Sequence, residues 1–318
     1  MAEWWVEAGI GETRAALIDD GRILEARILP DGELIAGTMV EARLIARIPE
    51  RNQGIIAWDG HEALITPLPA GITQGALTRA EIVRPAISEP GKPKRARARP
   101  SDALAGATPV LEGRTLRHTD PDALEAAGWS ELLEDAATGA IAFAGGELRV
   151  SLTPAMTLID VDGAAVPATL AVAGARAAAQ AIRRLDIAGS IGIDLPGGSD
   201  KAARHGAVNA IDGALPQPFE RTAMNGFGFV QIVRRRTRRS LPELYAMEPI
   251  LAHARALLRR AERTGGAGAR TITAHPSVIA ALSPAWVDEL TRRVGAQIVL
   301  REDAKLTISG GHVQAQFA

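Results

Sequence analysis

Two short apolar segments that each end on an aspartate constrain this chain more than any other feature. Residues 156–160 are Met-Thr-Leu-Ile-Asp, and residues 190–194 are Ser-Ile-Gly-Ile-Asp. Between them, residues 166–185 are rich in alanine and have the apolar spacing of a helix. A short apolar run, a helix and a second short apolar run are typical of a β-α-β unit. We therefore expect two parallel strands that are neighbours in one sheet.

Both aspartates lie at the carboxyl ends of these expected strands. Open α/β sheets place their sites at this edge, and neighbouring strands are about 4.8 Å apart. Asp160 and Asp194 are therefore candidates to share one Mg²⁺ ion, which is often held by one or two carboxylates and by substrate phosphates. Asp162 falls on the same face as Asp160 by strand alternation. The alternative is that all three are ordinary turn or helix-capping residues.

Composition narrows the class of protein. The 318 residues include no cysteine, which excludes disulfides, thiol catalysis and zinc sites built on cysteine. The first residues have no basic, apolar leader pattern, and no apolar run reaches the roughly 18 residues that span a membrane. We expect a cytoplasmic protein with no membrane partner.

The net charge of −1 does not indicate a nucleic-acid binder, but the basic residues are clustered. Residues 92–99 form one cluster, which is either a solvated linker or a contact surface. Residues 234–239 form the second, which follows an apolar run and is expected to leave the end of a strand. We predict that Arg234 and Arg236 alternate onto one face of that strand and contact phosphates.

The rest of the chain has alternating strand and helix patterns. Residues 1–30 predict a β-hairpin that turns at residues 19–21, and residues 37–85 predict a small OB-like barrel. Residues 88–101 are rich in proline and basic residues and predict a linker. Further elements are expected as helices at 120–136 (with Thr119 or Asp120 as N-cap), 200–212, 241–263 and 276–294, and as strands at 140–143, 147–152, 227–234, 271–274, 297–301 and 313–317.

Several of these segments together resemble the ribonuclease E/G family. The stretch at residues 145–163, which contains Asp160, resembles that family's central motif, and residues 185–194 resemble the segment that follows it. Residues 225–241 are similar to its third block. The stretches at residues 275–278 and 298–303 are similar to parts of its small terminal domain.

The resemblance implies a mixed α/β (α+β) protein with the family's order of domains. These are an RNase H-like subdomain interrupted by an S1/OB-like barrel, a DNase I-like catalytic subdomain and a small C-terminal α/β domain. The boundaries map to 1–36 with 102–145 for the RNase H-like part, 37–87 for the barrel, 88–101 for the basic linker, 146–240 for the catalytic part, and 241–318 for the long helix and small domain.

The implied activity is Mg²⁺-dependent endonucleolytic cleavage of single-stranded RNA. By the resemblance, Asp160 and Asp194 bind the metal, and Asp162 stands where the family has a supporting Asn. Two family residues are replaced: an Arg by Gly226, and a further Asp by Gly197. The cysteine-based zinc link between protomers and the segment that senses a 5′-monophosphate have no counterpart, so any oligomer forms in another way.

The barrel also departs from the family, since Ile56 and Leu64 stand where an S1 domain has aromatic side chains. Aromatic stacking contributes about 1–3 kcal/mol per base. A protein that keeps the fold and binds RNA without turnover is therefore the alternative function, and a metal-dependent phosphohydrolase of small molecules is a third.

Three further residues are candidates for RNA contact. Phe227, flanked by two glycines, either stacks on a base or fills the core. Lys201 and Arg204 open the helix after Asp194 and either reach phosphates or form ordinary helix surface.

Overall fold

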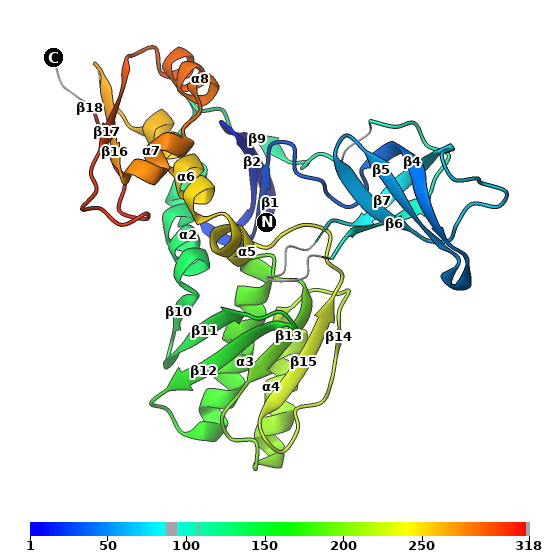
Figure 1. Cartoon of the computed structure of the whole chain (residues 1–318). Coiled ribbons are helices and arrows are strands. Elements are labelled where there is room, and N and C mark those ends of the chain that lie inside the picture. The colour runs from blue at the N-terminus through cyan, green and yellow to red at the C-terminus, as the bar shows by residue number, and fades with distance from the viewer. Residues whose placement is uncertain (87–93, 107–108, 267, 316–318) are drawn as a thin grey trace.

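The computed structural model describes residues 1–86, 94–106, 109–266 and 268–315. It is a mixed α/β protein with a closed five-stranded barrel and three further sheets. The barrel stands to one side of the two larger sheets, and the C-terminal module lies at the opposite side (Figure 1). None of the helices in these ranges is long and apolar enough to cross a membrane.

The β-α-β prediction is confirmed. Strand β12 (Thr157–Gly163) is followed by helix α3 (Pro167–Arg184) and strand β13 (Gly189–Asp194), and the two strands pair in parallel. They are the two central strands of a six-stranded sheet with the order β10-β11-β12-β13-β15-β14. The other elements of this region are β10 (Ala140–Phe143), β11 (Gly146–Leu152), α4 (Lys201–Ala214), β14 (Glu220–Arg221) and β15 (Phe229–Arg234).

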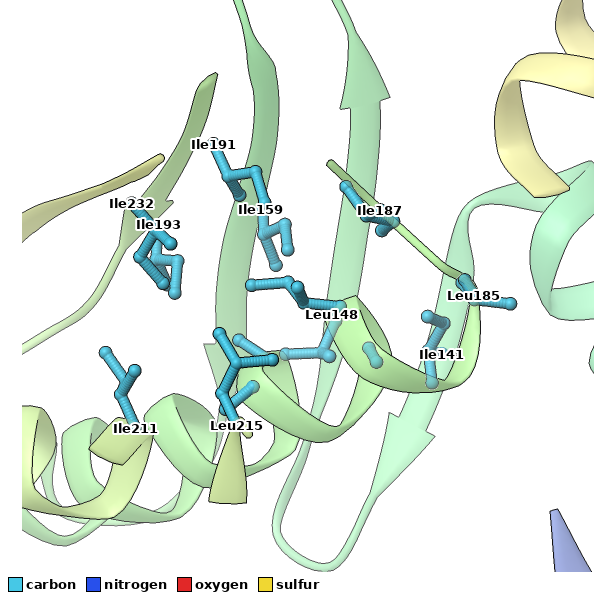
Figure 2. Packing of buried hydrophobic residues seen from close by; sticks show 14 of the residues in the cluster. Ile141, Leu148, Ile159, Leu185, Ile187, Ile191, Ile193, Ile211, Leu215 and Ile232 are labelled. Carbon is cyan, nitrogen blue, oxygen red and sulfur yellow. The ribbon is translucent and has the colours of Figure 1, made fainter. Parts of the chain in front are cut away.

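Helices α3 and α4 pack on one face of this sheet. Small residues on α3 allow a close approach, since a Cβ on Gly174 would overlap the Val161 side chain of β12. Strand residues alternate across the sheet, so Ile159, Ile191 and Ile193 point into this core. Figure 2 shows these isoleucines with Leu148 and Ile232 facing the helices. Alternate residues point to the opposite face, where most are exposed or half-buried, and we call this the open face.

The N-terminal hairpin of β2 (Glu12–Asp19) and β3 (Arg22–Pro30) is confirmed, and two further strands extend the sheet on the β2 side. Strands β1 (Glu3–Ala8), β2 and β3 form a sheet that β9 (Arg114–Thr115) joins in parallel with β1. The chain therefore leaves this sheet to build the barrel and then returns to it.

The helix expected at 120–136 is two helices, α1 (Ala123–Ala126) and α2 (Trp129–Thr138). Gly128 separates them in a left-handed conformation with φ of 93°. The N-cap is Asp122, whose carboxylate accepts the Glu125 N–H, so the choice of Thr119 or Asp120 was wrong. Thr119, Asp120 and Asp122 all carry a side-chain oxygen that can cap a helix, and the residue that caps is the one directly before the first helical residue.

The barrel predicted for residues 37–87 is present and closed, and one of its strands comes from the segment that was expected to be a linker. Its order is β4-β5-β6-β8-β7. Ala96 and Ala98 of β8 are buried while Arg97 and Arg99 are exposed, so five residues of the expected linker form an amphipathic strand. Residues 88–93 of that linker lie outside the described ranges. The elements are β4 (Met39–Ile48), η1 (Pro49–Arg51), β5 (Gln53–Trp58), β6 (His61–Ile65), β7 (Leu77–Arg84) and β8 (Ala96–Pro100).

The C-terminal region contains the expected module, but both long helices are broken. Pro249 and Pro284 each start a new helix, because proline disfavours a helical conformation at the preceding residue. Residues 316 and 317 of the last expected strand lie outside the described ranges. The elements are α5 (Leu241–Met247), α6 (Pro249–Arg263), β16 (Arg270–Ala274), α7 (Pro276–Ala281), α8 (Pro284–Val294), β17 (Ile298–Glu302) and β18 (His312–Ala315).

The boundary expected between residues 145 and 146 falls inside a hairpin. Strand β10 pairs antiparallel with β11 across Gly145 and Gly146, and a single hydrophobic cluster extends from the N-terminal sheet through α2 to the six-stranded sheet. The barrel and the C-terminal module have clusters of their own.

A buried carboxylate joins the N-terminal sheet to the C-terminal helix α6. Glu7 on β1 accepts hydrogen bonds from Arg14 Nη1 at 2.6 Å, Arg259 Nε at 3.0 Å and Arg263 Nη2 at 2.7 Å. Glu7 and Arg14 are each only 1% exposed. Arg259 also donates to the N-cap residue Asp122 at 2.6 Å. Residues that are far apart in the sequence are thus held around one charge.

We predict that Glu7→Gln destabilises the protein by about 3–5 kcal/mol, because it leaves buried guanidinium groups without their counter-charge. Denaturant unfolding measures this loss. Glu41→Gln is the control, since Glu41 belongs to an exposed pair with Arg79 at 3.9 Å and is expected to change stability by less than about 1 kcal/mol. Equal effects of the two substitutions would contradict the central role of Glu7.

The same carboxylate predicts acid sensitivity. Burial opposes ionisation of Glu7, but Arg14, Arg259 and Arg263 outweigh it and hold the pKa below the ordinary value of 4.5. A depressed folded-state pKa stabilises the fold above the unfolded-state pKa, and this contribution is lost as the pH falls through the folded-state value. The free energy of unfolding should therefore fall more steeply below about pH 4.5 in the wild type than in Glu7→Gln. Parallel pH profiles would contradict this prediction.

Candidate functional site

Asp160 and Asp194 lie side by side on the open face of the six-stranded sheet. They are direct register partners in the parallel pair of β12 and β13, and both are exposed. Asp194 is the last residue of β13, whereas β12 continues for three residues beyond Asp160 to Gly163. Register partners on neighbouring strands point to the same face. The fold therefore brings together the two carboxylates that the sequence indicated.

Two further side chains continue the row that these aspartates occupy. Arg149 on β11 pairs with Asp160, and Phe229 on β15 pairs with Asp194. The guanidinium of Arg149 is 60% exposed and lies 2.5 Å from the Glu147 carboxylate on its own strand. Sequence reasoning did not select Arg149, although the alternation of Glu147, Arg149 and Ser151 along β11 was a usable signal.

Asp162 occupies the next row of the same face. It is two residues beyond Asp160 on β12 and pairs with Glu147 on β11. Within the described ranges, no group of three or more histidine, cysteine or acidic side chains is arranged to hold a metal ion. The donor set is thus two exposed carboxylates on adjacent strands, which fits Mg²⁺ because that ion commonly keeps water and substrate phosphates as its other ligands.

Phe227 is presented to solvent in the loop before β15, the strand whose first residue pairs with Asp194. Its side chain is 93% exposed, so the alternative of a core residue is wrong. Asn225 shapes the loop, since its side-chain oxygen accepts the backbone N–H groups of Phe227 at 2.9 Å and Phe229 at 3.0 Å. The Leu195 N–H donates to the Gly228 carbonyl at 3.1 Å, which ties this loop to the residue after Asp194.

The two loops around Phe227 and after Asp194 approach each other through glycine backbones. A Cβ on Gly228 would overlap the Leu195 carbonyl oxygen, and Gly228 has a φ of +94°. A Cβ on Gly198 would overlap the Gly228 nitrogen. Arg204 Nη1 donates to the Gly198 carbonyl at 2.6 Å, so its guanidinium supports this loop. Lys201 is exposed at the start of α4.

Arg234 and Arg236 do not share one face of a strand, which corrects that part of the sequence prediction. Arg234 pairs with Gly189 at the opposite end of β13 from Asp194, and its Nη1 donates to the Ile187 carbonyl at 2.8 Å. Strand β15 ends at Arg234, so Arg236 does not share its face, and Arg236 Nη2 lies 2.6 Å from Glu243. Apolar alternation located the strand, but tertiary ion pairs decided where these side chains point.

Neither Ile56 nor Leu64 of the barrel presents an exposed side chain on which a base could stack. Ile56 is fully buried in the barrel core, and Leu64 is half-buried. Trp58 packs partly against the same core, with its ring centroid 5.6 Å from that of His61. Among the aromatic residues that the structure describes, the exposed one is Phe227, in the loop that is tied to the residue after Asp194.

No model of a known protein family matches the sequence, and no curated protein matches it.

We predict that Gly228→Ala destabilises the protein by about 1–3 kcal/mol and displaces the Phe227 loop, because the new Cβ meets the Leu195 carbonyl in a strained backbone. Gly226→Ala is the matched control: a Cβ there meets nothing within 4 Å. Thermal unfolding and the fluorescence of a Phe227→Trp background report the two effects. Equal stability of the two alanine variants would show that the close approach does not constrain the loops.

Proposed function

We propose that this protein is an Mg²⁺-dependent endoribonuclease that cleaves single-stranded RNA. The observation that carries the proposal is the register pairing of Asp160 with Asp194 on the open face, with both carboxylates exposed. The exposed Phe227 in the loop before β15 supports a single-stranded substrate, because aromatic side chains stack on unpaired bases.

Each residue of the site has a separate role in this proposal. Asp160 and Asp194 would hold the cation, which when bound activates a water and stabilises charge on the scissile phosphate. Arg149 lies next to Asp160 in the same row and offers an exposed guanidinium to a phosphate oxygen. Phe227 orients the chain by stacking on a base, and Asn225 and Arg204 hold the loops that present Phe227 and Asp194.

The proposal extends to the domain architecture. The chain has an interrupted N-terminal sheet, an inserted closed barrel, a six-stranded sheet and a small C-terminal module, in the order that the resemblance to the ribonuclease E/G family implies. On this basis we assign the barrel as S1/OB-like, the N-terminal sheet as RNase H-like and the six-stranded sheet as DNase I-like.

An RNA-binding protein without turnover is the second candidate. The observation that favours it is the donor set, because no group of three acidic or histidine ligands occurs among the residues described. Gly226, which replaces an arginine of the resembled family, leaves open space beside the site. The two candidates share the binding surface and differ only in cleavage.

We predict that Asp160→Asn and Asp194→Asn each lower Mg²⁺-dependent RNA cleavage at least about 100-fold, because each removes one of the two charged ligands. Asp288→Asn makes the same chemical change at an exposed position on α8 and should leave the rate unchanged. A fluorescently labelled single-stranded RNA, incubated with Mg²⁺ or with EDTA, measures the cleavage.

Cleavage that survives in EDTA or in Asp194→Asn would contradict the proposal. Binding without cleavage by the wild type would support the second candidate. The absence of both would exclude a nucleic-acid function.

We predict that Phe227→Ala weakens RNA binding by about 1–3 kcal/mol while Phe227→Trp preserves it, because only an aromatic ring stacks on a base. Phe227 is 93% exposed, so both variants should retain wild-type stability. Fluorescence anisotropy in EDTA measures binding apart from cleavage. Equal affinity of the two variants would contradict the stacking role.

A further inference from the structure

The two basic clusters of the sequence meet at one cleft. A cleft of about 1010 Å³ lies between the barrel, the amino ends of β12 and β13, and helix α5. Lys94 and Arg97 of the first cluster line one wall, and Arg234 and Arg236 of the second line another. These pairs are 140 residues apart in the chain, so only the tertiary fold brings them together.

The charges that line this cleft are strongly unbalanced. Among the lining residues that the structure describes, the cationic ones are the two pairs above and Arg84, and the acidic one is Glu243, which already lies 2.6 Å from Arg236. Arg97 is exposed on β8, and its guanidinium has no hydrogen-bond or ion-pair partner within the ranges that the structure describes. Such a cleft attracts anions, and exposed guanidinium groups bind phosphate oxygens in a bidentate manner.

The cleft is continuous with the open face that carries the aspartates. Ser190 and Val233 line the cleft, are register partners, and lie on the same face as Asp194 by strand alternation. Ser190 is four residues before Asp194 on β13, which corresponds to about 13 Å along the strand. A single extended strand of nucleic acid can therefore occupy the cleft and the carboxylate pair at once.

We infer that this cleft is a binding site for the phosphate backbone of single-stranded RNA, separate from the site of cleavage. The inference rests on the proposed function for the identity of the polyanion. It assigns the cleft to the part of the RNA that extends from the aspartates toward the barrel. RNA binding is thus sequence-independent at this end, because phosphate contacts carry no base information.

The test measures binding of a labelled oligouridylate of about 20 nucleotides, a length that exceeds the span of one barrel, by anisotropy in EDTA so that nothing is cleaved. Arg97→Glu changes the barrel wall, and Ala155→Glu changes the opposite wall at an exposed turn residue. Arg47→Glu is the matched control, since Arg47 is an exposed barrel arginine on β4 outside the cleft.

We expect Arg97→Glu and Ala155→Glu each to weaken binding about tenfold or more, and Arg97→Ala to lower the slope of log affinity against log salt by about one. Arg47→Glu should retain wild-type affinity. Equal weakening by all three glutamate variants would show a general effect of charge and would overturn the inference. A loss of affinity confined to Arg97→Glu would also overturn it, because binding would then involve the barrel alone.

The two proposals can fail separately. RNA that binds through both walls of the cleft but is not cleaved with Mg²⁺ contradicts the nuclease activity and leaves the cleft assignment standing. Mg²⁺-dependent cleavage with unchanged affinity in Arg97→Glu and Ala155→Glu contradicts the cleft assignment alone. A wild type that does not bind the oligouridylate overturns the cleft assignment directly. Circular dichroism of each variant verifies its fold.

Discussion

The register of the parallel pair of β12 and β13 determines which side chains lie next to each other on the open face. Ile159 and Ile193 are partners on the buried face, and Asp160 and Asp194 are partners one residue later on the open face. A slip of one residue in either strand would place an aspartate against α3 and an isoleucine in solvent, at a high cost in free energy. The hydrophobic contacts of the core therefore also align the two carboxylates.

A second constraint holds the elements around that sheet together. Glu7 is buried among three arginines from β2 and α6, and Arg259 extends the contact to Asp122 before α1. The desolvated carboxylate is stable only when these partners are present, so the N-terminal sheet, α1 and α6 are held in one arrangement. The same use of arginine recurs in residues 234–239, where Arg236, Arg238 and Arg239 pair with Glu243, Asp186 and Glu33.

The local sequence pattern predicted most helices and strands correctly, but it did not predict which partners the long side chains contact. The β-α-β unit and the barrel within residues 37–85 were predicted because their apolar alternation or helical spacing is strong. Strand β8 was missed because its small buried residues, Ala96 and Ala98, are weak hydrophobic signals between arginines. The arginine-rich segment after β15 suggested phosphate contacts from one strand face, yet Glu243, Asp186 and Glu33 hold three of its arginine side chains.

The sequence by itself determined that Asp160 and Asp194 lie on neighbouring parallel strands, because short-range periodicity and the crossover rule suffice for that conclusion. The sequence also indicated Phe227 between two glycines, but it could not decide whether this side chain lies in the core or in solvent. Tertiary structure alone exposed Phe227, put Arg149 beside Asp160, and separated Arg234 from the carboxylates while joining it to Arg97 across a cleft. Strand register, loop packing and long-range ion pairs decide these positions, and they depend on residues far apart in the chain.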